Sequence, residues 1–315
     1  MGTATPNPAE QHRWITKKQS LDFRLGPLRL GSLGFRASVL TTPFIQLPEQ
    51  VSSTVVIRSE LSDCAVAVIP AHPDLGHVKT IQKLNGLVRY VSFTEMRYLV
   101  DLRGSLSDYL AQFSAKRRKN LLRTVKKLTE FSGGRLECRE FHSPEKMLEF
   151  QRIAVEISQK TYKQKIGWAF QSSASFGQEL AADAAAGAVR GYVLYSDGVS
   201  AAYAFCRVQD PVIYYTHIGY DPRFSEYSPG TVLLFMLIER LFGEHRYMYL
   251  DFLGGAYWQY KQVFSTVHLP SATLFYFPPS PKNILVIMVH LAVRKLEAGM
   301  ARLKRFLKSF RSSED

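Results

Sequence analysis

The first third of the chain consists of short runs in which hydrophobic and polar residues alternate. Runs such as CAVAVIP, VRYVSF and RYLVDL are separated by Gly and Pro. Alternation with a period of two is typical of half-buried strands, and Gly and Pro favour the turns between them. The pattern predicts a smaller N-terminal α/β subdomain over residues 21–104, with a mixed sheet and helical connections. A disordered polar tail is expected over residues 1–20.

Near Ser105 the spacing of hydrophobic residues changes to that of a helix. Ser105 and Ser107 are both suitable N-caps. Apolar positions then lie on one helical stripe, at Leu121, Leu122, Val125 and Leu128. The opposite face is basic, with Lys116, Arg117, Arg118, Lys119, Arg123, Lys126 and Lys127. No acidic residue offsets this charge before Glu130. The helix is therefore a candidate for contact with phosphate or an acidic substrate, or else it is a solvated face.

The order of elements after this helix predicts an α+β domain. A strand, LECREF, and two helices come first, and the hairpin RGYVLYSDGVSAAYAFCRV turns at Asp197-Gly198. A third strand, VIYYTHIGY, leads into the apolar helix PGTVLLFMLIERL, and YMYLDFL and ATLFYF are further strands. We expect a domain over residues 105–278 with a mixed, mostly antiparallel sheet flanked by helices. Residues 279–315 are expected to form a basic amphipathic helix.

Composition narrows the class of protein. The chain is 46% hydrophobic, and its 40 Lys and Arg against 27 Asp and Glu give a formal charge of +13, which indicates an acidic partner. Three cysteines without CxxC spacing argue against a disulfide framework and favour the cytoplasm. No apolar run reaches the roughly 20 residues of a membrane span. We expect no metal, because no His, Cys or carboxylate group has ligand spacing.

One loop ends in Ser228-Pro229-Gly230-Thr231, where the apolar helix begins. A helix N-terminus presents unpaired N–H groups and a partial positive charge, and Gly lets an anion approach the backbone. Ser followed by Pro is also an ordinary way to start a helix. The loop is therefore either an anion site or a simple cap.

Five segments, in this order, carry a resemblance to a known family: FSAKRRKNLLRTVKKL, TYKQKIGW, YVLYSDGVSAAYAFCR, YYTHIGYDPRFSEYSPGTVLLFMLIERL and YLDFLGGAYWQYKQVFS. Together, over residues 100–277, they resemble the GNAT superfamily of acyltransferases, in its CelD/BcsL-like branch, which is similar to the FemAB transferases. The resemblance implies a GNAT-like fold. For the N-terminal half, the FemAB likeness raises a degenerate second copy of that fold as an alternative.

The resemblance also implies a co-substrate, acyl-CoA, whose pyrophosphate lies on the loop before Gly230. Ser228, Gly230, Thr231 and Arg223 are then the expected cofactor-binding residues. The family's loop follows the pattern Q/R-x-x-G-x-G/A, whereas this chain has RFSEYSPG, with Gly230 as its one glycine.

Transfer to an amine favours a general base and a proton donor for the leaving thiolate. Asp251 and His217 are the candidate bases. Asp251 matches the family's D-x-x-x-G through Gly255, with a structural salt bridge as the alternative. Strand alternation places His217 on one face with Tyr215 and Gly219.

The candidate proton donors are tyrosines, namely Tyr220, Tyr257 and Tyr260. For the substrate, Arg118 and Arg123 are candidates because Arg binds phosphate through a bidentate fork. Tyr162 and Lys261 are further candidates by resemblance. An amphipathic helix, or a Lys stem over aromatic rings, would also explain these two.

The sequence favours an N-acyltransferase that moves an acyl group from acyl-CoA to an amino group of a sugar, amino acid or cell-envelope or polysaccharide precursor. One alternative is a FemAB-like transferase that uses aminoacyl-tRNA. Another is a non-catalytic protein with a degenerate transferase fold that binds nucleic acid or anionic membrane. A small-molecule or glycan-precursor acceptor is the expected partner, and nucleic acid is less favoured. The expected location is the cytoplasm. The C-terminal helix could lie on the inner membrane face, or it could pack on the N-terminal half or on a partner subunit.

Overall fold

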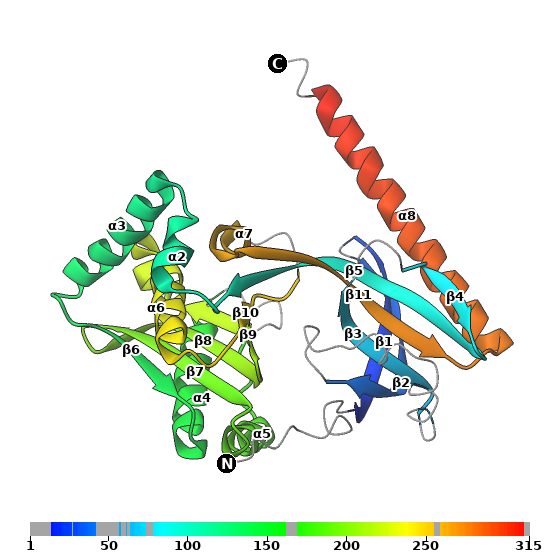
Figure 1. The fold of residues 1–315 in the computed structure, drawn as a ribbon, viewed down its shortest axis with the longest axis horizontal. Helices are drawn as coiled ribbons and strands as arrows, with labels where there is room; N and C mark the ends of the chain where they lie inside the picture. The colour runs from blue at the N-terminus through cyan, green and yellow to red at the C-terminus, as the bar shows by residue number, and fades with distance from the viewer. Residues whose placement is uncertain are drawn as a thin grey trace, which may run out of the picture. The chain divides into compact units, whose positions relative to one another are not determined.

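The computed structural model describes residues 14–26, 28–41, 57, 61, 64–73, 78–161, 169–254 and 259–311, without the side chains of residue 259 and of residues 304–311. The chain forms two units (Figure 1). One unit is Met96–Leu269, and the other combines Met1–Glu95 with Pro270–Asp315. The predicted α+β class is confirmed.

The unit Met96–Leu269 is built on a mostly antiparallel sheet. Its strands are β5 (Leu87–Asp101, in part), β6 (Leu136–Phe141), β7 (Val189–Ser196), β8 (Val199–Gln209), β9 (Val212–Tyr220) and β10 (Tyr249–Asp251), and β11 (Val267–Phe277) contributes its first residues. The strand order is β5-β10-β9-β8-β7-β6, and only the β9–β10 pair is parallel.

Helices cover both faces of this sheet. They are α2 (Leu106–Ala111), α3 (Ala115–Phe131), α4 (Pro144–Gln159), α5 (Ala174–Ala185), the 3₁₀ helix η5 (Pro222–Tyr227), α6 (Pro229–Glu244) and α7 (Gln259–Phe264). The helices α3 and α6 pack on one face and α4 and α5 on the other, so that each face has its own hydrophobic core (Figure 1). Serines cap four of the helices: Ser105, Ser114, Ser143 and Ser173 each accept a hydrogen bond from an amide three residues later. Of the two caps expected near the start of the first helix, Ser105 is the one observed.

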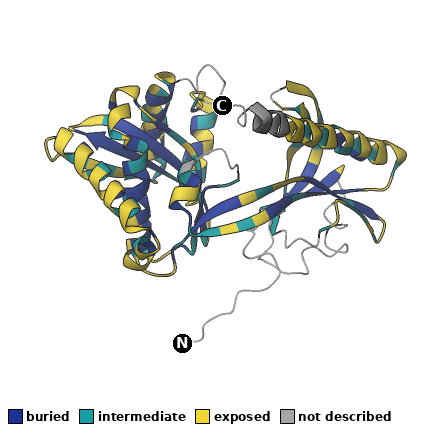
Figure 2. Cartoon of the chain, turned by 90° about the horizontal axis from the view of Figure 1, so that it is seen from above, coloured by how far each residue is buried: buried dark blue, intermediate teal, exposed yellow. Residues whose placement is uncertain are grey.

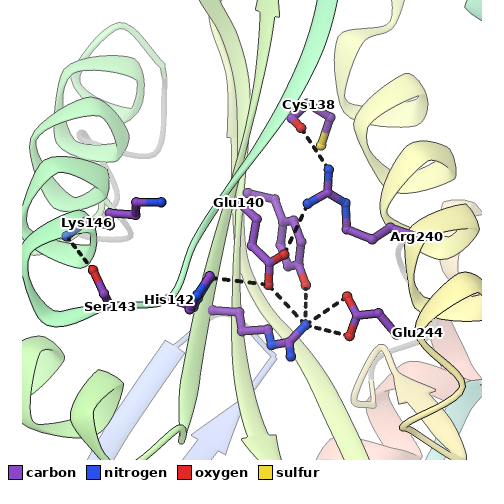
Figure 3. Close-up of polar contacts among 9 residues, drawn as sticks. Cys138, Glu140, His142, Ser143, Lys146, Arg240 and Glu244 are labelled. Atoms are coloured by element: carbon purple, nitrogen blue, oxygen red, sulfur yellow. Dashed lines mark hydrogen bonds and ion pairs between the residues drawn. The ribbon is translucent and has the colours of Figure 1, made fainter.

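A network of charges fixes the C-terminal half of α6 against the sheet (Figure 3). Arg190 on β7 bridges Glu140 on β6 and Glu244 on α6, with N···O distances of 3.0 and 2.7 Å. Arg240 on α6 reaches the other oxygen of Glu140 at 3.1 Å. Because Arg190 and Glu140 are mostly buried, this network holds α6 in one position, and the start of the helix is placed with it.

The other unit is a sheet with one long helix. It contains β1 (Trp14–Leu25), β2 (Leu28–Leu40), β3 (Val66–Pro73), β4 (Ile81–Leu84), most of β5, most of β11, and α8 (Pro281–Arg311). The strand order is β1-β2-β3-β11-β5, with β4 paired to β5. The helix α8 packs on this core through Ile287.

The structure corrects one predicted boundary. The tail expected over residues 1–20 does not include residues 14–20, since β1 begins at Trp14 and pairs with β2 from Trp14↔Leu40 to Leu25↔Leu28. Backbone pairing along this hairpin orders a segment whose polar composition suggested a tail. The helix expected over residues 279–315 is observed as α8, and it shares a core with the N-terminal strands. The helical connections expected in residues 21–104 lie mostly outside the described residues.

Candidate functional site

A β-bulge interrupts β9 in the middle of its pairing with β8. Tyr215 pairs with Cys206 and His217 pairs with Phe205, so Thr216 is the extra residue. The bulge reverses the alternation of side chains along β9. The prediction that His217 shares a face with Tyr215 is therefore wrong: Tyr215 lies in the core with α3 and α6, whereas the exposed His217 packs on the rings of Phe170 and Phe205 in the α4–α5 core.

The strands β9 and β10 separate just before the bulge. Within the described residues they pair only from Val212 to Tyr214, because β10 ends at Asp251 while β9 continues to Tyr220. A cavity of about 440 Å³ lies where the two strands part. Its aromatic lining residues are Tyr203, Tyr215, Tyr220, Tyr260 and Phe264.

The N-terminus of α6 opens into the same cavity. Ser228, Pro229, Gly230 and Thr231 all line it. Ser228 has φ +50° and its side chain does not cap the helix. Pro229 has no N–H, and the amides of Thr231 and Val232 donate to the Ser228 carbonyl at 3.0 and 3.3 Å. The Gly230 amide is therefore the one at this helix start that has no acceptor among the described residues. A Cβ placed on Gly230 would meet no atom within 4 Å, which means that the space beside this residue is open. The expected anion-binding segment therefore faces a real cavity, apart from Arg223.

Arg223 is turned toward a carboxylate that the sequence analysis did not single out. Its guanidinium donates to both oxygens of Asp221 at 2.8–3.1 Å. Asp221 is 1% exposed and also accepts from Lys160 Nζ at 3.0 Å, and Lys160 lines the cavity. The hydrogen bonds from Arg223, with that from Lys160, hold the pKa of Asp221 well below its usual range. The sequence signal that could have identified Asp221 is the Asp-Pro pair at the start of η5, because this pair is common at the start of a turn.

Tyr260 contributes a hydroxyl-bearing ring to the cavity. The ring packs edge-on against Tyr215 and Phe252, at centroid distances of 6.3 and 6.0 Å. Burial raises the pKa of Tyr260 to about 12, so the hydroxyl keeps its proton at neutral pH. The candidate donor is thus placed at the cavity in its protonated form.

Asp251 and Lys261 lie in a neighbouring buried cluster. Arg97 donates to Asp251 Oδ2 through Nε at 2.9 Å and Nη2 at 2.5 Å, and the Leu253 amide donates to Oδ1 at 2.6 Å. Burial raises the pKa of the Asp251 carboxyl, while Arg97 opposes this shift. Lys261 Nζ donates to the carbonyl of Gly254. Neither Asp251 nor Lys261 is among the described residues that line the cavity.

A second cavity, of about 370 Å³, lies between α3 and the start of α6. It shares Thr231 with the first cavity, and its other polar lining residues are Ser114, Lys116, Arg117, Asn120 and Thr124. The guanidinium carbon of Arg117 lies 3.7 Å from the centre of the Phe113 ring. Its Nε and Nη2 are buried without a hydrogen-bond partner among the described residues. Desolvation lowers the pKa of this guanidinium. A guanidinium thus lines the cavity with two nitrogens that lack an acceptor in the described part of the chain.

The other predicted arginines occupy different places. Arg118 donates to the Leu110 carbonyl at 3.3 Å and is not among the described residues of either cavity. Arg123 lines a third hollow, which also includes Lys126, Lys127 and Ser228. Tyr162, Gly255 and Tyr257 lie outside the described residues. Within the described part of the chain, no cluster of three His, Cys, Asp or Glu residues could hold a metal ion.

Comparison with known proteins agrees with this architecture. Residues 115–262 match a family model described as an acetyltransferase (GNAT) domain. FemX has a TM-score of 0.53 at 10% identity, with 87% of this chain and 90% of FemX covered. The C-terminal domain of a putative lysylphosphatidylglycerol synthetase from Agrobacterium fabrum has a TM-score of 0.51 at 13% identity, with coverages of 82% and 84%.

No curated protein matches the chain. The family model lies within the unit that contains both cavities, and the two solved structures share the arrangement of elements. The chain therefore has a GNAT-like fold, with a mostly antiparallel sheet flanked by helices.

Proposed function

We propose that the chain is an N-acyltransferase that moves an acyl group from acyl-CoA to the amino group of a sugar, amino acid or cell-envelope precursor, as in the CelD/BcsL-like branch. One observation carries the proposal: the cavity beside β9, beyond its last pair with β10, is lined by the start of α6, where no side chain caps the helix and the Gly230 amide has no acceptor among the described residues. Helix amides suit a diphosphate, and the aromatic wall suits the apolar part of a thioester.

The second cavity supports a donor that carries several phosphates. Thr231 lines both cavities, so a ligand that reaches the α6 amides can extend toward Arg117 and Lys116. Arg117 has no acceptor among the described residues for its buried nitrogens, and a phosphate would supply one. This arrangement links the basic helix to the donor.

In the proposed reaction the acceptor nitrogen attacks the thioester carbonyl carbon. The new C–N bond forms, the C–S bond breaks, and backbone N–H groups along β9 beyond Tyr214 stabilise the oxyanion between the two events. Tyr260 gives its proton to the leaving thiolate and regains one from water, while the nitrogen loses one proton to water. No side chain is assigned as the base, since the exposed His217 packs on the α4–α5 side of the sheet and Asp251 is held by Arg97.

Replacing Tyr260 by Phe is expected to lower kcat about 100-fold with little change in the KM for the donor, because the ring packing stays while the proton donor is lost. Steady-state kinetics measure both constants. The matched control is Tyr220→Phe, which removes an exposed hydroxyl from the same cavity and should retain most activity. An unchanged kcat in Tyr260→Phe would remove Tyr260 from the mechanism.

Replacing Arg117 by Met is expected to raise the KM for acyl-CoA about 10-fold or more, since a charged hydrogen bond to phosphate is lost. The melting temperature should not fall, because the variant removes a desolvated cation without an acceptor. Lys119→Met, an exposed change on the same helix, is the control. Equal KM values in the two variants would contradict a phosphate contact at Arg117.

Turnover against a panel of donors tests the function. Release of free CoA thiol from acetyl-CoA or longer thioesters in the presence of amines supports it. The FemAB-like alternative, favoured by the fold of FemX and by the basic α3, predicts transfer from aminoacyl-tRNA instead. RNA binding that weakens steeply with salt, without turnover of either donor, would favour a non-catalytic protein.

A further inference from the structure

The helix α8 has one face on the protein and an apolar face on the solvent. Its inner face is built into the sheet: Ile287 and His290 are 2% and 5% exposed. His290 Nδ1 forms a 2.6 Å hydrogen bond with the Tyr90 hydroxyl, and Arg294 donates to the Val91 carbonyl at 2.8 Å. The orientation of α8 about its own axis is therefore fixed by buried contacts.

The outer face follows from that orientation. At about 100° per residue, the positions opposite Ile287 and His290 form one stripe along the helix. The exposed residues on this stripe are Leu285 (64%), Met288 (52%), Val289 (45%), Leu296 (55%), Met300 (41%) and Leu303 (57%). Figure 2 shows the exposed character of much of the helix. Single exposed apolar residues are ordinary, but a continuous stripe of them marks an interaction surface.

The charge around the stripe is strongly positive. Between Pro281 and Arg311 the sequence has eight Lys and Arg residues against one acidic residue, Glu297. Lys295 and Arg302 lie along one edge of the stripe by helical angle. No helix of the described chain is long and apolar enough to span a bilayer. Basic residues beside an apolar stripe are the pattern of a helix that lies in the membrane interface.

We propose that α8 binds the surface of an anionic phospholipid bilayer, with Leu285, Met288 and Leu296 inserted among the acyl chains and with Lys295 and Arg302 at the headgroups. Each inserted side chain removes apolar area from water, and each nearby cation gains from the surface potential. A second copy of the chain fits less well, because two such helices would bring like charges together. The surface is independent of the two cavities.

Co-sedimentation of the full chain with vesicles tests this proposal. The chain should bind phosphatidylcholine vesicles that contain phosphatidylglycerol, bind pure phosphatidylcholine vesicles at least 10-fold more weakly, and lose affinity as salt rises. The triple variant Leu285→Ser, Met288→Ser, Leu296→Ser should lose at least 10-fold in binding, with an unchanged melting temperature because these side chains are exposed.

The matched control is Leu122→Ser with Val199→Ser. These residues are 51% and 41% exposed and belong to the unit Met96–Leu269, so the control removes exposed apolar area from the unit that does not contain α8 and should bind as the parent chain does. Equal binding by the triple variant and the parent, or no preference for the anionic vesicles, would overturn the proposal. Light scattering should show the same mass for the parent chain and the triple variant. A dimer that forms in the parent chain and is absent in the triple variant would also overturn the proposal.

Discussion

Gly230→Glu is expected to weaken acyl-CoA binding about 100-fold or more while the protein stays folded. The side chain would enter the open space beside Gly230 and place a carboxylate where the donor's diphosphate is proposed to bind. An acidic residue in the first turn is favourable to a helix, so α6 itself should not lose stability. Thermal unfolding and a direct binding titration would report the two effects separately.

Gly230→Ala is the matched control for this variant. It adds a methyl group in the same free space and a better helix former, without a charge. Binding of acyl-CoA should fall by less than about 10-fold. If Gly230→Glu and Gly230→Ala bind the donor equally well, the diphosphate does not lie at the start of α6.

The second large effect concerns stability. Arg97→Met is expected to lower the free energy of unfolding by about 3–5 kcal/mol, because it leaves the Asp251 carboxylate buried without its partner. The side chains of Arg97 and Asp251 are 7% and 0% exposed, so water cannot replace the lost ion pair. Chemical denaturation gives the value.

A second substitution separates a structural role of Asp251 from a catalytic one. Adding Asp251→Asn to Arg97→Met removes the unpaired charge and should restore part of the stability. This double variant should also regain turnover in proportion to its folded fraction. A stable double variant with no turnover would instead make Asp251 a catalytic residue.

Features set by neighbouring residues were predictable from the sequence. The serine caps, the end of α3 at Gly133-Gly134 and the hairpin at Asp197-Gly198 depend on local backbone preferences. The start of α6 at Ser228-Pro229 belongs to the same class. These local signals, in order, were sufficient for the fold class and for one wall of the main cavity.

Features that depend on distant or irregular contacts were not predictable. The bulge at Thr216 changes which residues of β9 share a face, and no turn residue marks it in VIYYTHIGY. The partner of Asp251, Arg97, lies 154 residues away. On α3, Arg117 and Arg118 differ by about 100° around the helix, and only packing of α3 on α6 determines which one faces the cavity.

Calorimetric titration of acetyl-CoA and longer acyl-CoA thioesters into the parent chain tests the central claim most directly. The account predicts saturable heat at one site per chain for at least one thioester, and loss of that heat in Gly230→Glu. Titrations without heat for every thioester, in a protein that is folded by thermal unfolding, would contradict the claim that the cavity at the start of α6 binds an acyl-CoA donor.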